Sequence, residues 1–143
     1  MKRLLYIPLL LIFLLGCKSN ENDSATPQSL ASSIEGKWLM TETEVTVNGK
    51  KVWQTVNTLT PVYLIFRSDG VMLDGDGKAS CCGPNELVIN GNSLKIVPQS
   101  EVTYSLNCAA VNCVSCPVLD IEYSGNQMII TYCIGGRVKY IKN

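Results

Sequence analysis

Short apolar runs separated by turn signals fill the chain from Ile34 to its end. The runs are rich in Val, Ile, Tyr, Trp and Thr, which favours strands, and none shows the sustained periodicity of a helix. Between them stand pairs of Gly with Asn or Asp, which accept the positive φ of tight hairpin turns. These pairs are Asn48-Gly49, Asp69-Gly70, Asn90-Gly91 and Gly125-Asn126. The pattern predicts one all-β domain over residues 34–143.

The spacing of the runs also predicts the architecture. The expected strands are 36–47, 51–58, 61–67, 70–74, 86–90, 93–97, 100–107, 117–124, 127–134 and 137–142. Many short strands joined by tight turns indicate an antiparallel meander of about eight to ten strands, closed into a β-barrel or packed as a sandwich. We favour the barrel, preceded by a single helical turn at Ser29–Ser33.

Alternation along two of these strands indicates which side chains point inward. The apolar sets that share a face are Val62, Leu64 and Phe66, and Met128, Ile130 and Tyr132. Ile65 and Ile129 lie on the opposite faces, so both strands are apolar on both sides. The pattern fits an apolar lumen with a covered outer face, and it also fits a well-filled core, which is the commoner outcome.

The N-terminus carries a targeting signal. Lys2 and Arg3 precede an apolar run that ends at Gly16-Cys17. A basic start, a short apolar stretch and a small residue at the exit are typical of a secretory signal peptide. The run is shorter than the roughly 20 residues that span a bilayer. Residues 1–16 are therefore interpreted as a cleaved signal peptide.

Leu14-Leu15-Gly16-Cys17 resembles the bacterial lipobox, in which the cysteine is acylated and becomes the first residue of the mature chain. An ordinary signal peptide with a chance cysteine is the alternative. Acyl chains bury many methylene groups and anchor a protein to a membrane. Lys18 follows the cysteine and no aspartate comes next, which resembles sorting to the outer membrane. We expect a lipid anchor on Cys17, with the protein on the periplasmic face or at the cell surface.

A polar segment connects this anchor to the apolar part of the chain. Residues 17–33 are rich in Ser, Asn, Asp, Glu, Thr, Pro and Gln, a composition that buries little surface. We interpret them as the lipidated cysteine and a flexible tether, followed by the folded domain over residues 34–143.

Gly36-Lys37-Trp38 at the start of the first expected strand resembles the G-x-W signature of lipocalins. The order of "FRSDG", "NGNSLKI" and "SGNQMII" is similar to that in short lipocalin-like domains of bacterial surface lipoproteins. The resemblance covers about residues 34–143 and implies a barrel that binds a small hydrophobic molecule. It also implies that Trp38 closes one end of the barrel with Arg137 against it, as a cation–π pair. The chain departs from the family in lacking a T-D-Y motif and a long helix near its end.

Six further cysteines follow Cys17. They are Cys81, Cys82, Cys108, Cys113, Cys116 and Cys133. An even number in a small secreted domain favours three disulfides, with fifteen possible pairings that the sequence leaves open. The clusters at 80–84 and 108–116 are expected to approach each other and to staple the rim of the barrel.

Other cysteine chemistry is a weaker alternative. Cys113 and Cys116 have the C-x-x-C spacing of redox sites, but Pro117 and a strand follow instead of the helix that lowers a thiol pKa. The spacing from Cys108 onward also resembles plant-type iron–sulfur sites, and four thiolates suit zinc. An oxidising compartment favours disulfides over both, so we expect no metal and no cofactor.

Histidine is absent, which excludes catalysis by Ser-His-Asp and Cys-His systems. Glu42 and Glu44 share a strand face and are expected to be solvated, Asp74–Gly77 is expected to form a turn, and Trp53 is expected to pack. Without Lys2 and Arg3, ten basic residues face twelve acidic ones, with no basic cluster for nucleic acid. We therefore expect no enzyme. We expect the protein to bind a small hydrophobic molecule or, alternatively, to be a structural or interaction module that docks another envelope protein or a polysaccharide.

Overall fold

The computed structural model describes residues 26–114 and 116–143. It places nine strands in one sheet and confirms the predicted β-rich domain. The helices and strands are α2 (Pro27–Ile34), β1 (Gly36–Val47), β2 (Lys50–Thr55), β3 (Tyr63–Phe66), β4 (Met72–Asp74), β5 (Glu86–Ile89), β6 (Asn92–Lys95), η2 (Cys108–Ala110), β7 (Val118–Ser124), β8 (Gln127–Tyr132) and β9 (Gly136–Lys142). Cys17, the expected signal peptide and most of the expected tether lie outside the described residues.

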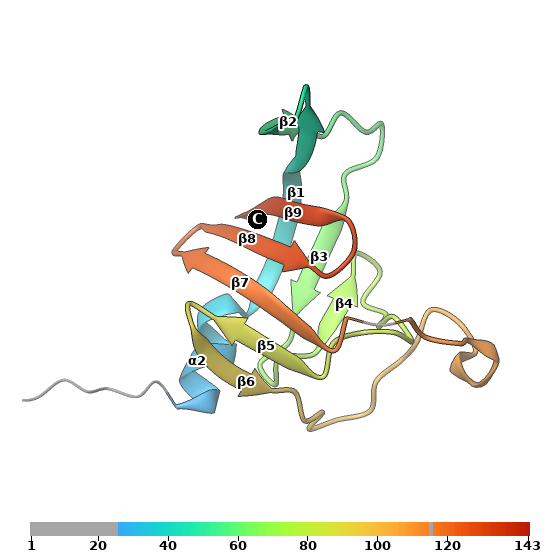
Figure 1. Ribbon diagram of the computed structural model, residues 1–143. Helices are drawn as coiled ribbons and strands as arrows, with labels where there is room; N and C mark the ends of the chain where they lie inside the picture. The colour runs from blue at the N-terminus through green and yellow to red at the C-terminus, as the bar shows by residue number, and fades with distance from the viewer. Residues whose placement is uncertain (1–25, 115) are drawn as a thin grey trace, which may run out of the picture.

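The sheet curls into an open half-barrel, so the expected closed antiparallel barrel is wrong (Figure 1). Its strand order is β4-β3-β1-β9-β8-β7-β5-β6, with β2 attached to β1 alone. The edge strands β4 and β6 are not paired with each other. One neighbouring pair, β5 with β7, is parallel. The simple meander therefore fails between β6 and β7.

The path of the chain after β6 explains the parallel pair. Because β5 and β6 form a hairpin, the chain leaves β6 at the end of the sheet where β5 began. Residues 96–114 stay at that end, and β7 then begins beside β5, with Glu86 opposite Val118. The strand expected at 100–107 does not form, and only Tyr104 makes an isolated bridge, to Ala79. The sheet consequently stays open on this side.

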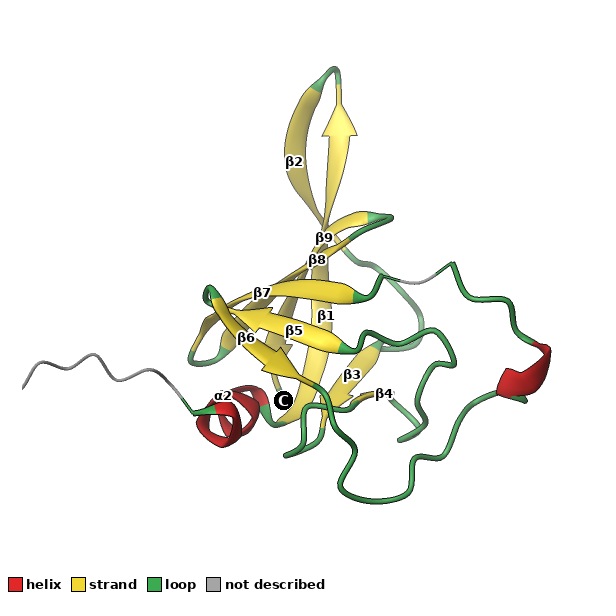
Figure 2. Ribbon diagram, turned by 60° about the horizontal axis from the view of Figure 1, so that its bottom comes forward, coloured by secondary structure: helices red, strands yellow, loops and turns green. Residues whose placement is uncertain are grey.

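Two hairpins follow directly from their turn residues. Asn48 and Gly49 have φ values of 51° and 75°, and Asn90 and Gly91 have 48° and 81°. Two successive residues with positive φ form the type I′ turn, whose twist matches the flanking strands. The β1–β2 and β5–β6 hairpins therefore form as predicted. The first of them projects beyond the rest of the sheet (Figure 2).

α2 shows that the folded domain begins before Ile34, which corrects the expected extent of the tether. Pro27 stands in the first turn, and the Thr26 side chain caps the helix by accepting from the Ser29 backbone N–H at 3.3 Å. The helical turn expected at Ser29–Ser33 is thus part of a longer helix. Its Leu30, Ala31 and Ile34 are buried in the core, so tertiary burial orders residues whose composition is largely polar.

The end of the half-barrel under α2 is filled with large side chains. Trp38 is fully buried and its Nε1 donates to the Ile34 carbonyl oxygen at 2.8 Å. The other largest fully buried side chains are Phe66, Ile34, Leu87, Ile89, Leu119, Ile121, Met128 and Ile130. Of the two readings of the apolar alternation, a filled core describes this part of the molecule.

A β-bulge in β1 decides which residues face outward. Met40 lies opposite Tyr140, but Glu42 lies opposite Lys139, so one extra residue stands on β1 between them. Val138, opposite Thr43, is buried. The bulge therefore turns Glu42 to the outer face while the inner face continues through Thr43.

Among the described residues, the structure contains no helix with the length and apolar character needed to cross a bilayer.

Candidate functional site

An apolar pocket opens on the unclosed side of the half-barrel. Its volume is about 220 Å³. The lining comes from β3, β4 and β9, and from two loop segments that contribute Ser80 and Ser105; the other lining residues are Val62, Tyr63, Leu64, Met72, Leu73, Asp74 and Tyr140. Typical small-molecule pockets measure roughly 300–1,000 Å³, so this one holds a small ligand or part of a larger one.

Tyr140 lines this pocket and forms a hydroxyl pair with Tyr132. The two phenol oxygens are 3.0 Å apart. Tyr140 is 5% exposed, whereas Tyr132 is partly exposed on the neighbouring strand. Burial raises the pKa of the Tyr132 phenol although its hydrogen bond to Tyr140 opposes the shift. Burial, and then the neighbouring Tyr132, raise the pKa of Tyr140 well above its ordinary value. The pair is therefore neutral at physiological pH.

Residues 99–105, here called the strap, run along the open side of the half-barrel. The Ala79 N–H donates to the Thr103 carbonyl at 2.8 Å, and the Ser105 N–H donates to the Ala79 carbonyl at 3.1 Å. Ala79 in turn bridges to Leu73 of β4. The strap thus extends the β4 edge by a few hydrogen bonds in place of the strand predicted there.

Asp69 holds the other end of the strap. Its Oδ2 accepts from the Gln99 N–H at 2.9 Å and from Arg67 Nη2 at 2.5 Å, and its Oδ1 accepts from the Val71 N–H at 3.3 Å. Asp69 is 7% exposed. Burial alone raises the pKa of this carboxyl, but the Gln99, Arg67 and Val71 donors outweigh it and hold the pKa below its ordinary value.

Arg67 and Gly70 complete this junction. Arg67 donates to Ser100 Oγ at 2.6 Å and to the Glu101 carbonyl at 3.1 Å. Gly70 has φ 81°, and a Cβ there would lie 3.2 Å from Leu94 Cδ2 on β6. Only glycine allows this close approach. The "FRSDG" segment therefore joins the two free edges of the sheet through side chains and loop backbone, a role that the sequence analysis missed.

A second, smaller cavity of about 130 Å³ lies between the strap and β4. Val102 and Tyr104 of the strap line one part of it, and Met72 and Ser80 are shared with the apolar pocket. Cys81 lies in its wall. The strap and residues 79–81 therefore shape both cavities.

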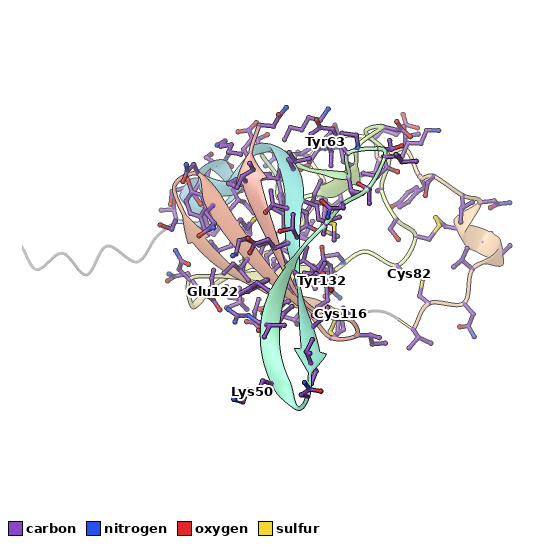
Figure 3. All side chains as sticks on the ribbon, turned by 90° about the horizontal axis from the view of Figure 1, so that it is seen from above. Lys50, Tyr63, Cys82, Cys116, Glu122 and Tyr132 are labelled. Atoms are coloured by element: carbon purple, nitrogen blue, oxygen red, sulfur yellow. A yellow bond between two sulfur atoms is a disulfide. The ribbon has the colours of Figure 1, made fainter. Side chains whose placement is uncertain are left out.

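The six cysteines form three disulfides, as predicted. The pairs are Cys81–Cys108, Cys82–Cys113 and Cys116–Cys133. The first two bonds hold the loop around η2 against the segment that leads into β5, and Cys82 stands at the base of this loop in Figure 3. Cys113 and Cys116 have different partners, so the C-x-x-C spacing does not form a dithiol pair. Among residues 26–114 and 116–143, no cluster of His, Cys, Asp and Glu is arranged to hold a metal.

The expected contact between Trp38 and Arg137 is wrong. In the β1–β9 pairing Trp38 lies opposite Lys142, whose Nζ is 5.4 Å from the centre of the Trp38 ring. Arg137 stands at the other end of β9, and its guanidinium carbon is 5.6 Å from the centre of the Trp53 ring. The register between β1 and β9 places Arg137 away from Trp38, and Lys142 is the cation that lies against the Trp38 ring.

Trp53 and a group of charged residues form a network on the outer face that the sequence analysis did not identify. Lys139 Nζ lies 4.5 Å from the Trp53 ring centre and pairs with Glu42. Arg137 pairs with Glu122 at 2.6 Å and lies 3.6 Å from Glu44, which also pairs with Lys51 at 3.0 Å. Glu42 and Glu44, expected to be solvated, are ion-paired, and Trp53 packs on cations as a structural residue.

The turn at Asp74–Gly77 forms as expected. Asp74 Oδ1 accepts from the backbone N–H groups of Asp76 and Lys78, both at 2.9 Å. The carboxylate is thereby used to order the turn.

No protein-family model, no curated protein and no solved structure matches this chain.

Proposed function

We propose that this chain is a lipid-anchored, non-enzymatic protein of the outer membrane whose half-barrel binds a small hydrophobic molecule at its open side. The observation that carries the proposal is the pocket of about 220 Å³, with Leu64, Met72 and Tyr140 in its lining. Apolar lining with a few polar groups is the usual composition of a small-molecule site. The anchor is proposed on the Gly16-Cys17 sequence alone.

The filled core limits what the ligand is. Trp38 and its neighbours occupy the end under α2, so the part of the chain that the structure describes has no deep lumen along the half-barrel. Burial of apolar surface contributes about 25 cal/mol per Å². A ligand seated only at the open side buries a limited area and is expected to bind in the micromolar rather than the nanomolar range.

Native mass spectrometry of the protein recovered from its own envelope tests this proposal. A hydrophobic adduct that is present in the native spectrum and lost on denaturation is the expected result. The matched variants are Val62→Trp, which fills the rim of the pocket, and Val47→Trp on the β1–β2 hairpin; these valines are 44% and 50% exposed. Loss of the adduct only in Val62→Trp supports the site. A clean apo mass in the unmodified protein contradicts ligand binding.

The anchor has its own test. Metabolic labelling with an alkyne fatty acid is expected to label the protein, and Cys17→Ser is expected to remove the label and release the chain from the membrane fraction. Cys116→Ser is the control, because it removes a different cysteine. A labelled or membrane-bound Cys17→Ser chain contradicts anchoring through this residue.

A second candidate function is a docking module, and one observation favours it. Residues 102–119 contain no charged residue, although much of the described part of this segment, 102–114 and 116–119, is exposed. Leu106 and Val114 are 67% and 84% exposed, and Ile134 beside the third disulfide is 76% exposed. Cores of protein interfaces are depleted in charge. Disulfides that fix such a loop also lower the entropic cost of binding.

The position of the uncharged loop around η2 is consistent with contact with a partner molecule. η2 and α2 lie on opposite sides of the molecule in both ribbon views (Figures 1 and 2). A photo-crosslinking residue at Val114 is expected to give one discrete adduct in intact cells. The same residue at Lys50 on the hairpin is the control, and equal crosslinking at both positions contradicts docking through the loop.

A further inference from the structure

The hydroxyl pair in the half-barrel leaves one proton without an acceptor among the residues that the structure describes. Each phenol has a single O–H donor. The Tyr132 and Tyr140 oxygens share one hydrogen bond at 3.0 Å, and among the described residues neither oxygen has another partner. One of the two hydroxyls therefore donates to the other, and the second proton has no acceptor within residues 26–114 and 116–143.

The position of Tyr140 indicates where that proton goes. Tyr140 lines the apolar pocket and is only 5% exposed. Tyr132 is partly exposed and stands next to Cys133, near the Cys116–Cys133 disulfide (Figure 3). If Tyr132 donates to Tyr140, the Tyr140 proton remains inside the half-barrel. A buried donor without an acceptor costs free energy, which an acceptor on a ligand would recover.

The charges around the pocket define the kind of acceptor. Asp74 is the only charged residue in the lining, and it is negative. An anionic ligand would meet this carboxylate and would also lose part of its solvation on entering the half-barrel. A protonated amine offers donors only and cannot accept the phenol proton. A neutral oxygen acceptor on an apolar body satisfies both requirements.

We infer that Tyr140, oriented by Tyr132, is the polar recognition element of this pocket, and that it selects neutral, mostly apolar molecules bearing a ketone, ester or alcohol oxygen. The inference rests on the proposed ligand-binding function. It assigns the two tyrosines different roles: Tyr140 contacts the ligand, whereas Tyr132 is a positioning residue that donates to Tyr140.

Fluorescence titration with two naphthalene probes tests the inference. The neutral probe is 6-propionyl-2-dimethylaminonaphthalene, a ketone, and the anionic probe is 8-anilinonaphthalene-1-sulfonate. The protein is the full mature chain carrying Cys17→Ser, so that no detergent competes for the probes. The ketone is expected to bind at least about tenfold more tightly than the sulfonate, and Val62→Trp is expected to abolish its binding.

The two tyrosine variants give the sharper comparison. Tyr140→Phe is expected to weaken ketone binding about 3- to 10-fold, the effect of one hydrogen bond. Tyr132→Phe is expected to weaken it by a smaller factor, about twofold, because it removes the hydrogen bond that orients Tyr140 but leaves the Tyr140 proton available. Near-ultraviolet circular dichroism verifies that both variants fold.

The possible outcomes distinguish failure of the role assigned to Tyr140 from failure of the proposed ligand-binding function. If the ketone binds but Tyr140→Phe leaves its affinity unchanged, or if both tyrosine variants weaken it equally, the role of Tyr140 is wrong while ligand binding stands. If the sulfonate binds as tightly as the ketone, the assigned ligand class is wrong. If neither probe binds the unmodified pocket, the proposed function itself is contradicted.

Discussion

The end of the half-barrel under α2 and its open side are held together by different forces. Under α2, neighbouring strands pair along their length and Trp38, Ile34 and Phe66 are almost completely buried. On the open side, the strap makes only a few backbone hydrogen bonds, and Asp69 with the disulfides supplies the remaining links. A small domain has a limited core, and this one is stabilised both by apolar packing under α2 and by disulfides on the open side. Because disulfides need no filled core around them, the open side has room for a pocket.

The largest effect is expected from removing the centre of the packed end. Trp38→Ala should lower the free energy of unfolding by about 3–5 kcal/mol, because it leaves a cavity and removes the hydrogen-bond donor to Ile34. Chemical denaturation followed by circular dichroism measures this loss. Trp53→Ala on the outer face is the matched control, and equal losses in the two variants would contradict the difference in burial.

The disulfides of the open side are expected to be partly redundant. Cys81–Cys108 and Cys82–Cys113 close loops of 27 and 31 residues between nearly the same two segments. In the chain-entropy model one such bond stabilises by about 3–4 kcal/mol, but the second restricts a chain that is already closed. Removing either bond by a Cys→Ser pair should therefore cost much less than removing both.

Denaturation of the two single-bond variants and of the combined variant measures this non-additivity. The Cys116–Cys133 bond closes a separate loop of 17 residues and serves as the independent reference. Its removal should add to that of either other bond. Fully additive costs for the two adjacent bonds would show that they constrain different parts of the molecule.

Asp69 should make the open side sensitive to acid. Its pKa is lower in the folded than in the unfolded chain, so its contribution is present above the unfolded pKa, near 4, and is lost as pH falls through the folded pKa. Asp69→Asn should cost about 1–3 kcal/mol at neutral pH and flatten the acid limb of the stability curve. Asp76→Asn, in an exposed turn, is the control. An unchanged acid limb in Asp69→Asn would contradict this link.

Replacing Trp53 should give the smallest loss of stability, and the loss should be confined to the β1–β2 hairpin. Trp53→Leu removes the contact with Lys139 and Arg137 and should cost about 0.5–2 kcal/mol. Amide hydrogen exchange should rise in residues 44–53 and stay unchanged in β7 and β8. A general rise would mean that the outer network supports the whole sheet.

Strands and turns with local signals were predictable. The bounds of β1 and the turns at Asn48-Gly49 and Asn90-Gly91 follow from strand propensity and positive φ, which are properties of a few neighbouring residues. The segment at 100–107 has similar composition but forms no regular strand. A strand requires a partner edge, and here the chain path offers only Ala79.

The candidate site was predictable only in part. Tyr132 was recognised on an inner face, and the six cysteines were expected to pair. Neither the hydroxyl pair with Tyr140 nor the choice of cysteine partners could be read from the sequence, because both depend on which strands are neighbours. The contact assigned to Trp38 and Arg137 failed for the same reason, since the β1–β9 register places Lys142 opposite Trp38.

By itself, the amino-acid sequence determined the β-rich character, the hairpin turns and the even set of cysteines, because these depend on local propensity, apolar alternation and composition. Tertiary structure decided that the sheet remains an open half-barrel, that α2 orders residues expected in a tether, and that Tyr140 lies in a pocket. These features depend on contacts between segments that are distant in the chain. The energies of such contacts cannot be read from the pattern of residues along any one strand.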